Sequence, residues 1–173
     1  MKKIVFGITG LNLGGAERVL VDLSNKLVEK YDITIFTLYG NGEFEKQLDK
    51  RVKLVSVYDR KYEEINKVTK LKTSFQLFNY NLRNMLYKKY IKGKYDVEIA
   101  FLEGPITWIF SCPGNARKIA WVHNDIEDVF GSGEKAKAKQ ELNKEAYLKY
   151  DELIFVSQDN LNKFQRYFKG NKV

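Results

Sequence analysis

The sequence predicts an α/β domain in which helices cover both faces of a mainly parallel sheet of six or seven strands. Three observations favour this class. Short apolar runs of strand length alternate with segments of helical periodicity along the chain. The length of 173 residues suits one domain with a sizeable core. The composition, 44% hydrophobic and 30% charged, is typical of a globular protein.

Six segments have the character of buried strands. Each is short, rich in apolar or β-branched residues and followed by turn residues, as expected of strands covered on both faces. They are 4–8, 33–38, 52–57, 97–102, 119–122 and 153–156.

Helical patterns separate these strands. Apolar residues recur at spacings of three and four in 16–27 and again from 65 to about 90, which predicts one helix there or two with a break near Thr73 and Ser74. Further helices are expected over 44–48, 105–110, 134–150 and 160–168. Helices between successive strands imply right-handed units with parallel strands. Because ligands of such sheets bind beyond the carboxyl ends of the strands, the residues that follow each strand are the candidates.

A glycine pair, Gly14 and Gly15, lies between the first strand and the first helix. Glycines there let backbone N–H groups approach an anion, and the helix N-terminus adds a partial positive charge. The loop lacks the Lys-Ser/Thr pair of a Walker A motif, and no acidic residue ends the second strand as in dinucleotide-binding proteins. The alternative is that the glycines only permit a tight turn.

Two polar residues stand at the same expected edge. His123, the single histidine, follows the fifth strand, and its ordinary pKa of about 6.5 lets it donate or accept near neutral pH. Glu103 follows the fourth strand and either faces a ligand or caps a helix. With one cysteine, one histidine and no Asp-x-Asp sequence, the chain gives no support for a metal site.

The net charge of +8 is concentrated in one segment. Residues 60–94 contain ten basic and two acidic residues, whereas the rest of the chain has 20 of each. Aromatic residues interleave with the lysines. The segment therefore suits a nucleic acid, an anionic membrane surface contacted by Lys88, Lys89 and Lys92, or a solvated helix face over a core stripe. The spacing favours core positions for Phe75 and Phe78.

Three motifs, in this order, resemble the N-terminal domain of the retaining GT-B glycosyltransferases of family 4. They are the GGAERVL run of 14–20, the KIAWVH run of 118–123 and the YDELIFVS run of 150–157. The resemblance covers essentially all of 1–173 and implies a Rossmann-like three-layer α/β/α domain, one half of a GT-B fold. The C-terminal donor-binding domain is expected to be absent from this chain, because 170–173 fall where the family passes into its hinge.

The resemblance also implies a reaction and roles for residues. The complete enzyme moves a hexose-type sugar from a nucleotide-sugar co-substrate to a glycan or lipid-linked acceptor, with retention and without a metal or other cofactor. This half binds the acceptor and is expected to be inactive alone. Gly14 and Gly15 would line the loop that faces the donor diphosphate and the acceptor. His123 would contact the transferred sugar near the reaction centre, and Glu103 and Thr107 would face the acceptor.

The family further implies surface polysaccharide or glycolipid synthesis by a cytoplasmic protein, peripheral on the inner face of the cell membrane. The cationic segment 60–94 would then meet anionic lipid, and no nucleic acid is expected. Two alternatives come from the residues themselves: a dehydrogenase-like module that binds a nucleotide or dinucleotide at the glycine loop, and a basic nucleic-acid-binding domain.

Overall fold

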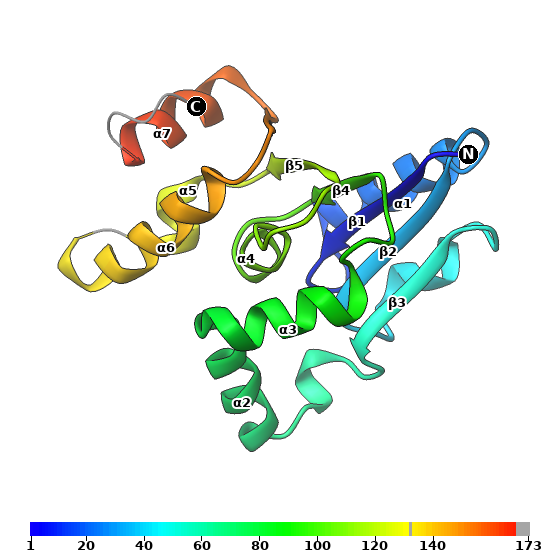
Figure 1. Ribbon diagram of the computed structural model, residues 1–173, viewed down its shortest axis with the longest axis horizontal. Coiled ribbons are helices and arrows are strands. Elements are labelled where there is room, and N and C mark those ends of the chain that lie inside the picture. Colours follow the sequence, from blue (N-terminus) through cyan, green and yellow to red (C-terminus); the bar gives the residue numbers. More distant parts are fainter. Residues whose placement is uncertain (132, 169–173) are drawn as a thin grey trace.

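The computed structural model describes residues 1–131 and 133–168, and a six-stranded parallel sheet forms its centre (Figure 1). The strand order is β3-β2-β1-β4-β5-β6. The strands are β1 (Lys3–Ile8), β2 (Asp32–Tyr39), β3 (Lys53–Tyr58), β4 (Val97–Ala100), β5 (Arg117–Val122) and β6 (Glu152–Phe155). The predicted Rossmann-like α/β class is confirmed, and each predicted strand is present.

The direction of the chain across the sheet reverses between β1 and β4. The chain moves outward from β1 to β3, crosses to β4 on the other side of β1, and continues outward to β6. Right-handed connections therefore place the helices before and after the crossing on opposite faces. One face carries α1 (Gly15–Leu27), and the other carries α2 (Lys67–Phe78), α3 (Tyr80–Tyr90) and α4 (Pro105–Phe110) (Figure 1). Ligands of such sheets bind in the crevice at the reversal.

Three α-helices and a short 3-10 helix follow β5 within the described residues. They are α5 (Ile126–Phe130), η3 (Glu134–Ala136), α6 (Lys137–Tyr147) and α7 (Gln158–Tyr167). The sequence did not predict α5, which Asp125 caps through its side chain. The expected helix over 134–150 begins as the 3-10 helix η3, and α6 then runs only from Lys137 to Tyr147. None of the described helices combines the length and apolar character needed to cross a bilayer. Residues 169–173, which include the expected approach to the hinge, lie outside the described residues.

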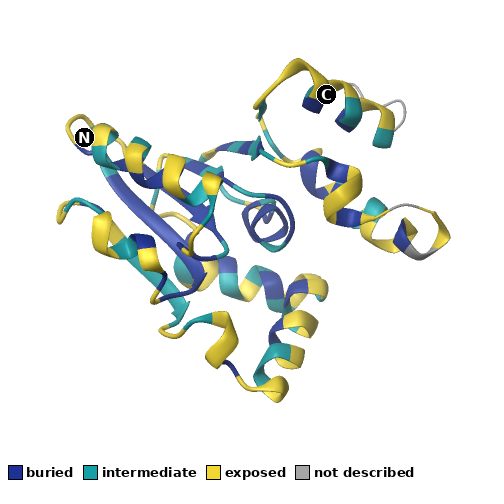
Figure 2. Ribbon diagram, turned by 180° about the vertical axis from the view of Figure 1, so that it is seen from behind, coloured by how far each residue is buried: buried dark blue, intermediate teal, exposed yellow. Residues whose placement is uncertain are grey.

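A buried layer lies on each side of the sheet. β1 and β2 are buried along most of their length, whereas the edge strands β3 and β6 are only half-buried (Figure 2). Along β1, Phe6 joins the layer under α1 and Val5 joins the opposite layer. Gly7 also faces that opposite layer. A Cβ at this position would lie 2.6 Å from Phe110 and 2.7 Å from Ile106, so the missing side chain lets α4 pack directly against β1.

A buried ion pair joins β4 and β5 to α3. Lys118 Nζ lies 2.5 Å from Glu98 Oε2, and it also donates to the Phe110 carbonyl at 2.6 Å. The Tyr87 hydroxyl donates to both Glu98 oxygens, at 3.0 and 3.1 Å. Burial, and then the charge of Glu98, raise the pKa of Tyr87, so the phenol stays protonated as a donor. Sequence analysis did not single out this cluster.

The long helical pattern after β3 forms two helices, and the division falls at Asn79 rather than near Thr73. The Asn79 side chain accepts the N–H of Leu82 at 3.2 Å and so begins α3. Thr73 lies inside α2, where its hydroxyl donates to the Thr69 carbonyl at 2.8 Å and accepts from the Tyr58 hydroxyl at 2.7 Å.

The expectation that Phe75 and Phe78 belong to the core is wrong. Both are exposed, whereas Thr73 and Leu77 are the buried residues of α2. Two faces of this helix carry residues at helical spacing. The face that carries Thr73 and Leu77 points inward, and there the Thr73 hydroxyl bonds to Tyr58. The face that carries Phe75 and Phe78 points outward.

Candidate functional site

The loops that follow β1, β4 and β5 meet at one edge of the sheet. The three strands are neighbours, and parallel strands end at the same edge. Gly14 and Gly15 lie in the first of these loops, Glu103 in the second and His123 directly after β5. The topology therefore places these four predicted residues at a common edge.

Glu103 connects the second and third of these loops. Its carboxylate accepts the backbone N–H of His123, the backbone N–H of Asn124 at 2.8 Å and the Asn124 side-chain amide at 2.9 Å. Three donors on a buried carboxylate fix its position and that of the backbone it holds. Glu103 therefore acts as a positioning residue for His123, a function that the sequence alone did not reveal.

The imidazole of His123 lies on the face of the sheet that carries α1. Its ring centroid is 4.6 Å from that of Phe101 and 5.5 Å from that of Trp121, on which it stacks at 20°. Nε2 is buried and has no hydrogen-bond partner among the described residues. Burial lowers the pKa of His123, while the carboxylate of Glu103 opposes this shift. The imidazole is therefore mostly neutral at neutral pH, and none of the described residues bonds to its Nε2.

Gly14 and Gly15 form the start of α1. Gly14 is extended (φ −165°, ψ 162°) and supplies no side-chain cap. The first N–H groups of a helix have no intrahelical acceptor, and they favour an anion. The Glu17 carboxylate of this turn lies beside them, next to the position of a Cβ at Gly14. The position of a Cβ at Gly15 has no neighbouring atom within 4 Å, which leaves this turn accessible.

Thr107 and the predicted membrane lysines lie elsewhere. Thr107 is buried in α4, where its hydroxyl donates to the Leu102 carbonyl at 3.2 Å. Lys88 and Lys89 are exposed in the last turn of α3, and Lys92 follows that helix. Since the chain next enters β4 at its amino end, these lysines lie at the edge of the sheet opposite to His123.

The structure adds a hollow of about 360 Å³ beside Glu103, between α2, α4 and α5. Its walls are largely aromatic. Tyr39 and Tyr62 meet edge to face with centroids 5.1 Å apart, and Phe78 and Trp108 pack at 5.2 Å. Burial, with the neighbouring tyrosines, raises the pKa of Tyr39 to about 12, so its phenol stays protonated.

Polar groups complete the lining of this hollow. Lys70 Nζ lies 4.2 Å from the centroid of the Tyr62 ring, and Lys139 contributes a second cation. Gly104, at φ +87°, makes the turn from β4 into α4 at the wall. Tyr39 is the last residue of β2, and Tyr62 lies in the segment that follows β3. Their meeting with Trp108, however, depends on a crossing of the sheet that local patterns do not specify.

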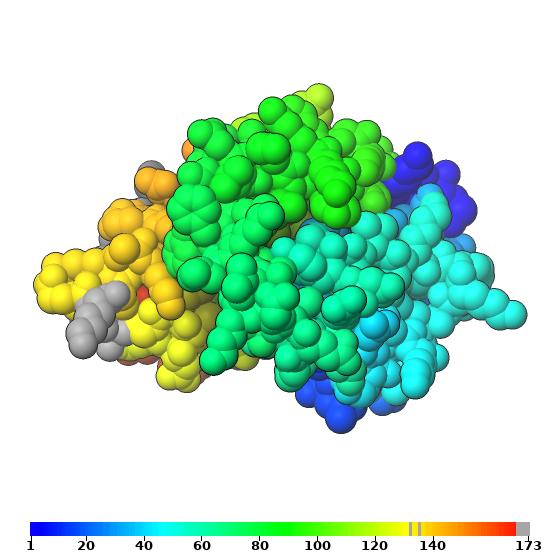
Figure 3. Space-filling view, turned by 90° about the horizontal axis from the view of Figure 1, so that it is seen from below, coloured from blue at the N-terminus to red at the C-terminus, as the bar shows by residue number. Residues whose placement is uncertain are grey.

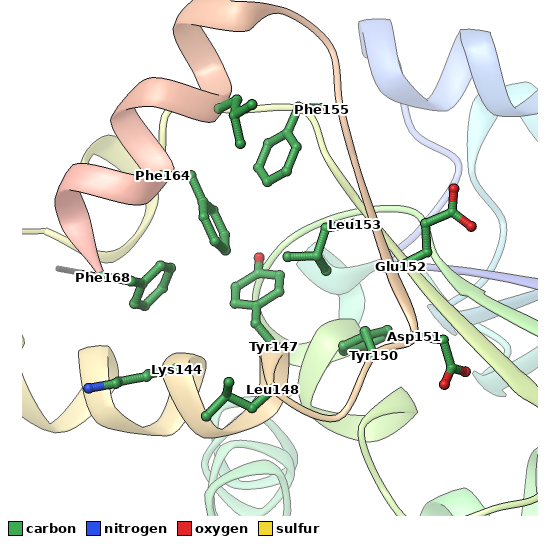
Figure 4. Close-up of a pocket in the computed structure, with 11 residues that line it drawn as sticks. Lys144, Tyr147, Leu148, Tyr150, Asp151, Glu152, Leu153, Phe155, Phe164 and Phe168 are labelled. Atoms are coloured by element: carbon green, nitrogen blue, oxygen red, sulfur yellow. The ribbon is translucent and has the colours of Figure 1, made fainter. Parts of the chain in front are cut away.

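Two larger hollows lie away from these residues. One, of about 470 Å³, lies between α6, α7 and β6. Figure 4 shows Phe155, Phe164 and Phe168 at this hollow, with Lys144, Asp151 and Glu152 also lining it. The other, of about 460 Å³, lies next to Arg83 and Cys112. Neither is lined by any predicted site residue. The hollow beside Glu103 is therefore the candidate site.

The family of the chain follows from comparison with known proteins. The model of the family described as "Glycosyltransferase Family 4" matches residues 13–173. The chain belongs to glycosyltransferase family 4. Membership of this family favours sugar transfer over the dinucleotide-binding and nucleic-acid-binding alternatives.

A curated relative of this family 4 domain comes from Campylobacter jejuni subsp. jejuni serotype O:2. It is named GalNAc-alpha-(1->4)-GalNAc-alpha-(1->3)-diNAcBac-PP-undecaprenol alpha-1,4-N-acetyl-D-galactosaminyltransferase. The two are 35% identical over 103 residues, which cover 60% of this chain and 26% of the relative. The alignment thus spans about a quarter of the relative's length.

The family 4 domain offers three chemical groups at one edge: a helix N-terminus for an anion, a neutral imidazole and an aromatic hollow with two lysines. Among residues 1–131 and 133–168, no three His, Cys, Asp or Glu side chains gather as metal ligands would. Independence from a metal stays a prediction.

Proposed function

We propose that this chain is the acceptor-binding half of a retaining glycosyltransferase. It holds a glycan or lipid-linked acceptor while a sugar is transferred from a nucleotide-sugar, in surface polysaccharide or glycolipid synthesis on the cytoplasmic side of the membrane. The observation that carries the proposal is the aromatic hollow beside Glu103, which opens at the sheet edge that also holds His123.

The lining of the hollow suits a sugar. The apolar face of a pyranose ring packs on aromatic side chains, and Tyr39, Tyr62 and Trp108 supply such rings. Lys70 and Lys139 suit the phosphates of a lipid diphosphate. The acceptor named for the C. jejuni relative carries both features, amino sugars and a diphosphate linked to undecaprenol. We therefore propose an acceptor of this class.

The donor faces the other side of the same edge. His123 and the start of α1 share one face of the sheet, so a nucleotide-sugar held there by a second domain meets both. The backbone N–H groups at the start of α1, at Gly14 and Gly15, stabilise the leaving diphosphate. The neutral imidazole of His123 exchanges hydrogen bonds with hydroxyl groups of the transferred sugar. Glu103 holds His123 in place for this contact.

The chain alone is expected to lack turnover. One wall of a cleft can neither exclude water nor hold donor against acceptor. Incubation with nucleotide-sugars and an acceptor should yield no product above background. Transfer at a rate comparable to two-domain enzymes would contradict the assignment as half of an enzyme.

Acceptor binding is the direct test. Calorimetric titration with the α-diphosphate of GalNAc-α-(1→4)-GalNAc should show binding, and Tyr62→Ala should weaken it by about tenfold through loss of ring stacking. Tyr80→Ala, which removes another exposed tyrosine outside the hollow, is the matched control. Equal effects of the two variants, or tight binding of NAD instead, would refute the proposal.

A further inference from the structure

The outward face of α2 carries an apolar stripe that the protein leaves in water. Val68, Leu71, Phe75 and Phe78 are 78%, 74%, 63% and 49% exposed. Their spacings of three, four and three residues place them on one side of the helix. We call these four residues the α2 stripe. Isolated apolar residues on a surface are ordinary, but a continuous exposed stripe marks a surface that contacts something.

The inward face of α2 explains why the stripe points outward. Thr73 and Leu77 are the buried residues of the helix, and the Thr73 hydroxyl bonds to Tyr58. The same side also lines the hollow with Thr73, Ser74 and Leu77. The inner face of α2 is therefore occupied by the sheet and the candidate site, and the stripe cannot turn inward without the loss of both contacts.

The charges around the stripe select a lipid surface as its partner. At 3.6 residues per turn, Lys67 flanks the stripe on one side and Lys72 on the other. The whole net charge of the chain, +8, arises within 60–94. An apolar stripe between lysines is the pattern of a helix that lies in a membrane interface, where the apolar face enters the acyl boundary and the lysines meet anionic headgroups.

The position of the stripe adds a functional reason. Figure 3 shows α2 and α3 spread over the middle of one side of the molecule. Phe78 belongs both to the stripe and to the wall of the hollow. A bilayer on the stripe therefore lies next to the mouth of the hollow, whereas Lys88, Lys89 and Lys92 are at the distant edge of the sheet.

We infer that α2 docks the protein on an anionic bilayer through Val68, Leu71, Phe75 and Phe78. The docked orientation presents the hollow to the headgroup layer, so a lipid-linked acceptor enters it without leaving the membrane. The docking on a bilayer does not depend on the proposed function. The delivery of an acceptor to the hollow does rest on the proposed function. Contact of Lys88, Lys89 and Lys92 with a membrane stays a separate prediction.

Sedimentation with vesicles tests the docking in the absence of any acceptor. The 173-residue chain is mixed with vesicles of phosphatidylglycerol and phosphatidylcholine, or of phosphatidylcholine alone. We expect binding to the anionic vesicles and a partition coefficient lowered by about tenfold or more in Leu71→Ser/Phe75→Ser. The matched control Val19→Ser/Leu148→Ser removes two exposed apolar residues from α1 and the end of α6. It should bind as the unchanged chain does.

Two further results decide against the inference. Unaltered vesicle binding of Leu71→Ser/Phe75→Ser would show that the stripe does not enter the bilayer. A dimer that forms in solution and is abolished by the same substitutions would assign the stripe to a second copy of the chain. Titration of the double variant with the soluble acceptor diphosphate separates the two proposals, because neither Leu71 nor Phe75 lines the hollow.

Discussion

The helix α1 and the α2–α3 pair cover opposite faces of the sheet and use different chemistry to do so. α1 buries Leu20 and Val21 against an apolar layer. The α2–α3 pair buries Leu77 in the opposite apolar layer and adds polar contacts: Thr73 with Tyr58, and Tyr87 with Glu98 and Lys118. Helical spacing shows that two faces of a helix differ, but it does not show which one the protein covers. Where the inner face is anchored by polar groups, the apolar face is free for a partner.

The polar anchor of α3 should give the largest loss of stability. Lys118→Ala leaves the carboxylate of Glu98 buried without its cation, which costs about 3–5 kcal/mol of unfolding free energy. The control Lys88→Ala, at an exposed site of α3, should change it by less than about 0.5 kcal/mol. Urea unfolding measures both. Similar midpoints for the two variants would show that the pair does not anchor the helix.

Leucine truncation compares the two helices directly. Leu20→Ala, in the buried layer under α1, should lower the free energy of unfolding by about 2–5 kcal/mol. Leu71→Ala, in the α2 stripe, should change it by no more than about 0.5 kcal/mol. The measurement is again urea unfolding in the absence of lipid. If Leu71→Ala lowered the free energy of unfolding as much as Leu20→Ala, the α2 stripe would be covered by other parts of the chain.

A part-buried hydroxyl pair, Thr73 with Tyr58, joins α2 to the end of β3. Thr73→Val keeps the shape of the side chain but leaves the Tyr58 hydroxyl without its acceptor, at a cost of about 1 kcal/mol. Ser74→Ala, at the next and exposed position, serves as the control for stability. An unchanged thermal midpoint in Thr73→Val would remove this hydrogen bond from the explanation of how α2 is oriented.

The smallest predicted effect is a change of stability with pH. It arises from His123, which lies on the face of the sheet that carries α1. The pKa of His123 is lowered in the folded protein, so the unfolded chain binds more protons as the pH falls. Stability is therefore full above the ordinary histidine pKa of about 6.5 and declines as the pH drops through that value toward the lower folded pKa.

His123 is the single histidine of the chain, which makes this dependence assignable. His123→Phe preserves ring packing on Phe101 and Trp121 and cannot titrate. The unfolding midpoint of this variant should be flat between about pH 7.5 and about pH 5.5. If the unfolding midpoint falls with pH equally in the unchanged chain and in His123→Phe, the titrating group is not His123.

Local patterns in the sequence were sufficient for the strands, because each strand is a short run rich in apolar or β-branched residues. The edge positions of Glu103 and His123 followed from the parallel topology. Their connection did not, because the Glu103 carboxylate bonds to a loop twenty residues later. The hollow could not be predicted from the topology either. It combines Tyr62 and Trp108, which belong to segments that meet only because the chain crosses the sheet. Long-range contacts of this kind leave no periodic signal.

The central claim is that the acceptor occupies the hollow beside Glu103, and the two tryptophans report on it separately. Trp108 lines the hollow and donates its indole N–H to Asn143 at 2.6 Å, whereas Trp121 stacks on His123 on the α1 side. A nitrogen-15 NMR titration with the acceptor diphosphate follows both indole signals. The account predicts a saturable shift of the Trp108 signal and little change at Trp121. A shift confined to Trp121, or none at saturating acceptor, would contradict it.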